Sequence, residues 1–128
     1  MDIQLRRAYE RPGRGDGYRV LVDRVWPRGV AKRDLELDAW RKEIAPSTRL
    51  RQWFGHDPQR WKEFQERYFR ELEDEQEAVG DLVKRARRGR VTLVYGARDP
   101  DHNQAVALRA YLRARAAGRR PRAAAPRV

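Results

Sequence analysis

Cysteine is absent from this chain of 128 residues. Its absence excludes a disulfide framework, cysteine-ligated zinc, iron–sulfur clusters and catalysis by a thiol nucleophile. Long apolar runs are absent as well. Met1 leads directly into charged sequence, and no stretch is long enough for a signal peptide or a membrane span. We therefore expect a soluble, cytoplasmic protein with no membrane partner.

Histidine is scarce, and the glycine patterns that bind phosphate are missing. The two histidines, His56 and His102, do not lie at metal-motif spacing from a second ligand. The glycines of segment 13–17 precede an apolar, strand-like run, whereas a Rossmann or Walker loop follows its strand. The sequence thus predicts no metal site and carries no nucleotide fingerprint, and it leaves any cofactor unknown.

Acidic residues are outnumbered, because 30 lysines and arginines face 19 aspartates and glutamates, giving a net charge of +11. Residues 113–128 contain six arginines and no acid, and without them the rest of the chain carries +5. Residues 118–128 have little apolar bulk and two prolines. We expect a single α/β domain over residues 1–117, followed by a basic, disordered tail. Such a tail either solubilises the protein or contacts nucleic acid.

Short apolar runs alternate with segments of helical periodicity. The continuous, β-branched run at 91–95 predicts a strand covered on both faces. Strands are also expected at 3–9 and 18–22, while 35–38 is ambiguous between strand and extended chain. Caps and stop signals predict a short helix capped by Asp38 that carries Trp40 and Ile44, a helix capped by Ser47, a helix that opens at Asp57 and Pro58, and helices over 75–87 and 101–116. This order indicates an α/β fold with a small, at least partly parallel sheet of three or four strands flanked by helices.

The segment that follows the 18–22 strand carries the strongest signal of a site. Residues 23–29 read Asp-Arg-Val-Trp-Pro-Arg-Gly, although a simple turn needs only glycine, proline, asparagine or aspartate. A second polar loop, 96–103, follows the 91–95 strand. If these two strands are parallel, both loops meet at the carboxyl edge of the sheet, where open α/β sheets bind ligands.

The side chains of these two loops predict a site for an anion. Arginine forks suit phosphate or carboxylate, the start of the last helix offers free N–H groups, and an indole face can stack on a base or sugar. The candidate ligand-binding residues are Arg24, Trp26, Arg28, Lys32, Ser47, Arg51, Arg98 and Asn103. The candidate acid–base residues are Asp23, which is the first choice, Asp99 and His102.

Each candidate also has a structural interpretation. Asp23 could pair with Arg24 or Arg98, Asp99 could cap the last helix, and Trp26 could be a packed anchor of its loop. Ser47 is better explained as a helix cap than as a nucleophile. A carboxylate among arginines is expected to stay ionised, which suits orientation of a ligand better than proton transfer.

The same residues resemble a known family. The motif at 20–29, followed by Lys32, the segments 38–40, 45–47, 50–51 and 92–95, and Asn103, is similar to the YeaO-like proteins, catalogued as domain of unknown function 488. The resemblance runs from about residue 3 to residue 112 and leaves the basic tail outside. It implies a small α/β domain of a bacterial cytosolic protein. It brings no activity, substrate or cofactor.

Three functions therefore remain open. The leading hypothesis is a binder of an anionic small molecule, such as a nucleotide, at the carboxyl edge of the sheet, with catalysis undecided. The second is a nucleic-acid-binding module that uses the same arginines together with the basic tail. The third is a structural or interaction module. The sequence leaves the oligomeric state unknown.

Overall fold

A computed structural model describes residues 1–127 of the chain. Four strands form one sheet: β1 (Asp2–Arg7), β2 (Tyr18–Leu21), β3 (Ala39–Trp40) and β4 (Arg90–Tyr95). Their order in the sheet is β1-β4-β2-β3, and every neighbouring pair is parallel. The predicted α/β class and its small parallel sheet are confirmed, and β4 occupies the centre because it pairs with β1 on one side and β2 on the other.

Five α-helices follow or separate the strands: α1 (Lys32–Leu35), α2 (Thr48–Phe54), α3 (Trp61–Leu72), α4 (Gln76–Arg88) and α5 (Gln104–Ala116). The predicted caps of α2 are observed. Ser47 accepts a hydrogen bond from the N–H of Leu50, and Gly55 ends the helix in the left-handed region with φ of 53°. Short 3₁₀ turns lie at Lys42–Ile44, Pro58–Arg60 and Glu73–Glu75.

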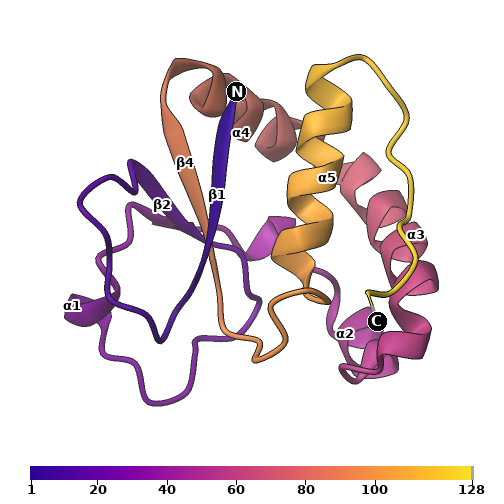
Figure 1. The fold of residues 1–128 in the computed structure, drawn as a ribbon, viewed down its shortest axis with the longest axis horizontal. Coiled ribbons are helices and arrows are strands. Elements are labelled where there is room, and N and C mark those ends of the chain that lie inside the picture. The colour runs from indigo at the N-terminus through magenta and orange to yellow at the C-terminus, as the bar shows by residue number, and fades with distance from the viewer. Residues whose placement is uncertain (128) are drawn as a thin grey trace.

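The core fills one face of the sheet. Alternate strand residues such as Val20, Val91 and Leu93 point to that face and pack with Phe64, Leu82 and other buried residues of α3, α4 and α5. The opposite face is covered by the segment that includes α1, through a second cluster around Leu21, Leu35, Val94 and the two tryptophans Trp26 and Trp40. Figure 1 shows α1 and α5 on opposite sides of the sheet. Both faces are thus covered, as a parallel sheet requires.

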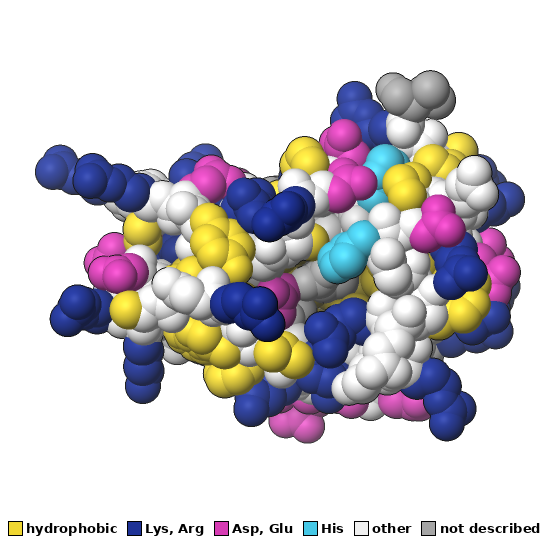
Figure 2. Space-filling view, turned by 90° about the horizontal axis from the view of Figure 1, so that it is seen from below, with side chains coloured by type: hydrophobic (Ala, Val, Ile, Leu, Met, Phe, Trp, Pro, Cys, Tyr) yellow, Lys and Arg dark blue, Asp and Glu magenta, His cyan; other side chains and the backbone are white. Residues whose placement is uncertain are grey.

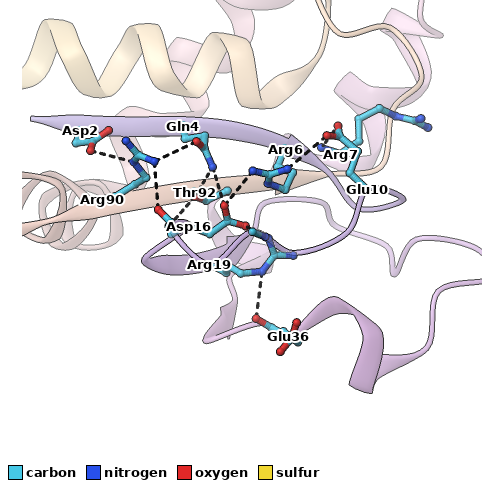
Figure 3. A network of polar contacts seen from close by, with 12 residues as sticks. Asp2, Gln4, Arg6, Arg7, Glu10, Asp16, Arg19, Glu36, Arg90 and Thr92 are labelled. Atoms are coloured by element: carbon cyan, nitrogen blue, oxygen red, sulfur yellow. Dashed lines mark hydrogen bonds and ion pairs between the residues drawn. The ribbon is translucent and has the colours of Figure 1, made fainter.

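A buried polar network lies on the face that α1 covers (Figure 3). Asp16 is 2% exposed, and its carboxylate accepts hydrogen bonds from Gln4, Arg6, Arg19 and the N–H of Gly13. Arg19 is also buried, and it donates to the backbone carbonyls of residues 35 and 36. The network ties the glycine-rich 13–17 loop and the end of α1 to the sheet. The loop therefore has a structural role.

Two predicted helices differ from the structure. The predicted helix that Asp38 caps is wrong at Trp40, because residues 39–40 pair with β2 as strand β3. Asp38 instead accepts a hydrogen bond from the N–H of Arg19 at 2.8 Å, which fixes the start of that pairing. The last helix begins at Gln104 and not at residue 101, because the carboxamide oxygen of Asn103 accepts from the N–H groups of residues 105 and 106.

The arginine-rich segment after α5 folds back along the protein. Gly118, with φ of 67°, reverses the chain, and the N–H of Arg119 donates to the carbonyl of Ala114 at 2.8 Å. Residues 119–127 have no regular secondary structure and run beside α3 (Figure 1). There Ala124 exchanges two hydrogen bonds, of 2.8 and 3.2 Å, with the carboxamide of Gln65, which is 2% exposed.

Gln65→Ala is expected to release this tail. The substitution removes both hydrogen bonds to Ala124, so we expect a loss of about 1–3 kcal/mol in the free energy of unfolding. Trypsin should then cleave faster after Arg122 than in the wild-type protein. Gln52→Ala, an exposed position on α2, is the matched control. Equally fast cleavage of all three proteins would instead support the predicted disorder of residues 118–128 in solution.

Among residues 1–127, no helix is both long enough and apolar enough to cross a membrane. Within the same range, no group of three or more histidine, cysteine, aspartate or glutamate side chains is arranged to hold a metal ion.

Candidate functional site

A pocket of about 360 Å³ opens at the carboxyl edge of the sheet, between the loops after β2 and β4 and helix α2. Figure 2 views the molecule from this end and shows lysine and arginine side chains around a hollow. The loops meet because β2 and β4 are adjacent and parallel. Of the candidate residues, the pocket wall contains Asp23, Arg24, Trp26, Arg28, Arg51 and Asn103.

Asp23 joins the two loops. One carboxylate oxygen accepts a hydrogen bond from the N–H of Gly96 at 2.9 Å, and the other accepts from the carboxamide of Gln104. A Cβ on Gly96 would lie 2.8 Å from the Asp23 carboxylate, so a larger residue there would displace that carboxylate. The predicted ion pair with Arg24 or Arg98 is not formed.

Asp23 is easier to protonate than an ordinary aspartate, although a pKa of about 6 still leaves it mostly ionised at pH 7, as predicted. Burial raises the pKa of its carboxyl to about 6, although the Gly96 N–H, the charge of Arg51 and the Gln104 hydrogen bond each lower it. The sequence argument counted nearby arginines and could not count desolvation, which acts in the opposite direction. A carboxyl with a pKa near 6 changes charge close to neutral pH, so the charge of the pocket depends on pH.

Arg24 and Trp26 shape the pocket. The guanidinium of Arg24 donates to the backbone carbonyls of Ala45 and Pro46, at 3.1 and 2.9 Å, and so fastens the chain that leads into α2. The indole N–H of Trp26 donates to the carbonyl of Val30 at 2.7 Å, and its ring meets that of Trp40 edge to face. Trp26 is thus placed as a packed loop anchor that also forms part of the wall.

Arg28 and Arg51 lie at the rim. Both are exposed, and within residues 1–127 neither guanidinium takes part in an ion pair or hydrogen bond. Arg28 lies in a turn closed by a hydrogen bond from the N–H of Val30 to the carbonyl of Pro27, at 3.4 Å, and its side chain is exposed. These two arginines are the cations of the wall that remain available to a ligand.

Asn103 has a structural position at the back of the pocket. Its carboxamide oxygen caps α5, and its NH₂ donates to the carbonyl of Asp99 at 2.9 Å. Sequence reasoning missed its neighbour Gln104, which binds Asp23, and it also missed the apolar walls from Phe54 and Phe64. The signal for Gln104 was its place in the first turn of a helix that starts at the site. Phe54 and Phe64 were interpreted only as core residues.

Five candidate residues lie outside the pocket. His102 and Asp99 bind one another, with 2.7 Å between Nδ1 of the histidine and a carboxylate oxygen, and Nε2 of His102 accepts from the N–H of Arg127. Burial raises the pKa of Asp99, but the hydrogen bonds and charge of His102 and the N–H of Asp101 outweigh it, so the pKa is lowered overall. The other residues outside the wall are Ser47, which donates to Glu71, and the exposed Lys32 and Arg98.

These positions change two predictions about the last helix. His102 precedes the N-cap residue and therefore lies outside the first turn of α5, packed edge-on against Trp61. Asp99 caps only the short turn before α5, because its carboxylate accepts from the N–H groups of Asp101 and His102 while Asn103 caps the helix itself.

The fold and the pocket define a small, all-parallel α/β domain with a ligand-sized cavity at the carboxyl edge of its sheet. The chain belongs to the DUF488-N3i family, described as the inactive DUF488-N3 subclade, whose model matches residues 2–127. The predicted family membership is confirmed. This family model extends through the basic tail, whereas the alignments to individual relatives span 113 residues, 88% of the chain.

Curated relatives support the same assignment. The chain is 42% identical over 113 residues to the uncharacterised protein YeaO of Escherichia coli strain K12, an alignment that covers 88% of this chain and 98% of YeaO. It is 41% identical over 113 residues to the uncharacterised proteins Mb3100c of Mycobacterium bovis and Rv3073c of Mycobacterium tuberculosis, covering 88% of this chain and 95% of each relative. No solved structure matches the chain.

Proposed function

We propose that the pocket at the carboxyl edge of the sheet binds an anionic small molecule and does not catalyse a reaction on it. The observation that carries this proposal is that Arg28 and Arg51, the rim cations, make no ion pair within residues 1–127. A phosphate or carboxylate between them would accept charge-assisted, forked hydrogen bonds.

The rest of the wall narrows the class of ligand. Phe54, Phe64 and Pro27 offer apolar surface to the body of a ligand, and Asp23 offers acceptor lone pairs to a hydrogen-bond donor. The volume of about 360 Å³ lies within the usual range for small-molecule sites. A nucleotide has the required combination of a phosphate, a flat body and N–H donors, and it is our first candidate.

Binding without catalysis rests on two supports. The matched family is described as an inactive subclade. Two of the three candidate acid–base residues, Asp99 and His102, bind one another and lie outside the pocket wall. Asp23 is held by Gly96 and Gln104, an arrangement suited to accepting a hydrogen bond from a ligand.

A thermal-shift titration with AMP, ADP, inorganic phosphate and ribose 5-phosphate tests the proposal. We expect at least one phosphorylated probe to raise the Tm of the wild-type protein, by an amount that grows with the logarithm of its concentration above the Kd. Arg28→Ala and Arg51→Ala should each weaken binding of that probe about 10- to 100-fold, since a hydrogen bond to a charged group contributes about 1.5–3 kcal/mol. Both residues are exposed, so neither substitution should shift the ligand-free Tm appreciably.

Arg49→Ala is the matched control, because Arg49 is an exposed arginine on the same helix as Arg51 and lies outside the pocket wall. It should bind the probe as the wild-type protein does. The proposal fails if no probe shifts the wild-type Tm, or if Arg49→Ala weakens binding as much as Arg51→Ala. A large loss of ligand-free stability in Arg28→Ala would instead favour the purely structural interpretation.

A further inference from the structure

A second concentration of positive charge lies where α4 and α5 end and the tail begins. Two hollows, of about 350 and 650 Å³, lie on either side of the last turns of α5, because Arg115 lines one and Arg113 lines the other, and residues two apart on a helix point to opposite faces. We call their exposed cationic lining the α4–α5 basic surface. It consists of Lys84, Arg87, Arg88, Arg113, Arg115, Arg119, Arg120 and Arg122.

The turn at the end of α5 assembles this surface. Gly118 takes a left-handed conformation, and hydrogen bonds from the N–H groups of Gly118 and Arg119 to the carbonyls of Arg115 and Ala114 close the turn. The chain therefore returns beside α5 and brings Arg119, Arg120 and Arg122 to the same hollow as Arg113. The hydrogen bonds between Ala124 and Gln65 hold the segment at its far end.

The charges of this surface are not neutralised within residues 1–127. None of the eight side chains forms an ion pair there, whereas Arg6, Arg19, Arg41 and Arg90 elsewhere each pair with a carboxylate. Cations in the last turn of a helix interact favourably with its dipole, which accounts for Arg87, Arg88, Arg113 and Arg115. The helix dipole does not account for the three arginines of the tail, which the fold places beside Arg113, a side chain of the same charge.

We propose that the α4–α5 basic surface binds the phosphate backbone of a nucleic acid. Eight exposed cations, distributed over two hollows on either side of the end of α5, suit several phosphates of one backbone better than one small anion. Seven of the eight are arginines, whose planar forks bind phosphate oxygens in pairs. The exposed large hydrophobic residues within 1–127 are Met1, Tyr9 and Val25, none of which lies on this surface, so it lacks the apolar side chains that a membrane-bound face inserts.

This surface is separate from the pocket. The pocket is lined by residues 103 and 104 at the amino end of α5, and the basic surface includes residues at the carboxyl end of the same helix. Figure 1 shows these two ends of α5. A helix of 13 residues is about 20 Å long. The sequence hypothesis placed the pocket arginines and the tail in one nucleic-acid site. The two lie at opposite ends of α5, so the proposal for nucleic acid concerns the α4–α5 basic surface alone.

Fluorescence anisotropy with a labelled 20-base-pair DNA duplex and the equivalent RNA duplex tests the proposal. We expect the wild-type protein to bind at 50 mM salt and to weaken steeply as salt rises. Arg119→Ala/Arg120→Ala/Arg122→Ala should weaken binding at least tenfold. Loss of three phosphate contacts should also make the slope of log K against log salt shallower by about 2.7.

The matched control is Arg11→Ala/Arg14→Ala/Arg49→Ala, which removes the same charge from exposed positions elsewhere. It should lose less than threefold in affinity, as should Arg28→Ala, which separates this proposal from that of the pocket. Absence of duplex binding at 50 mM salt, or equal losses in the two triple variants, would overturn the proposal. So would tighter binding to phosphatidylserine vesicles than to either duplex, which would assign the surface to a membrane.

Discussion

Replacing Asp16 by alanine is expected to reduce the free energy of unfolding by about 3–5 kcal/mol, a large part of the stability of a domain of this size. The carboxylate of Asp16 is 2% exposed and accepts hydrogen bonds from Arg6, Arg19, Gln4 and the N–H of Gly13. Without it, the guanidinium of Arg19, itself 4% exposed, is left charged and unpaired in the protein interior.

Urea unfolding at pH 7 measures this effect. Arg6→Ala is the informative comparison, because Arg6 is partly exposed and its loss leaves Asp16 paired with Arg19. It should cost much less than Asp16→Ala. Similar, small losses in both variants, within about 1 kcal/mol, would show that solvent enters the network and that the pair is not buried in solution.

The same network predicts that the free energy of unfolding falls at acidic pH. Burial raises the pKa of Asp16, but the hydrogen bonds from Gly13, Arg19 and Gln4 and the charge of Arg6 outweigh it, so the pKa is lowered overall. A carboxyl with a lowered folded-state pKa contributes stability that is present above its unfolded pKa of 3.8 and is lost as pH falls below it. Asp16→Ala should remove that part of the acid dependence.

The sequence was sufficient for three of the four strands and for the meeting of the two loops that line the pocket. The apolar runs at 18–22 and 91–95 are short and continuous, which marks strands covered on both faces, and helices between them imply parallel pairing. Once those two strands are parallel neighbours, chain geometry brings residues 23 and 96 together. The meeting of these two loops is thus a consequence of topology, which a sequence pattern can reveal.

The assignment of individual arginines was beyond the sequence. The sequence does not distinguish Arg24, Arg28 and Arg98. In the structure Arg24 donates hydrogen bonds to the carbonyls of Ala45 and Pro46, whereas Arg28 lies at the pocket rim and Arg98 lies outside the pocket. Which partner a guanidinium finds depends on backbone carbonyls, and these leave no trace in the pattern of side chains.

The buried pairs were missed for a related reason. Asp16 appears as one residue of a polar, glycine-rich loop, and His102 as a helix-start histidine next to a candidate ligand site. Their burial arises from long-range contacts, which bring Asp16 to Gln4 and Thr92 and bring the tail at Arg127 to His102. Local periodicity describes the element in which a residue lies and does not report what folds over it.

Asp23→Asn is expected to stabilise the protein above pH 6 and to leave its stability nearly unchanged below pH 4. The folded-state pKa of Asp23 is raised from 3.8 to about 6, so the folded state binds the proton more tightly than the unfolded chain. Well below pH 3.8 the carboxyl is protonated in both states and costs nothing. As pH rises from about 4 to 6 the folded state must hold a desolvated charge, and its stability falls by up to about 3 kcal/mol.

Asparagine keeps the shape of the side chain without that charge. Its carbonyl oxygen can accept from the N–H of Gly96, and its NH₂ can donate to the Gln104 carboxamide once that amide has turned over. Urea unfolding of both proteins from pH 4 to pH 8 measures the difference, which cancels the titration of every other group. A difference independent of pH would contradict the raised pKa. If Asp23→Asn is more stable at pH 7 and yet binds an N–H-bearing nucleotide more weakly, the charge that costs the fold stability is the one that the ligand uses.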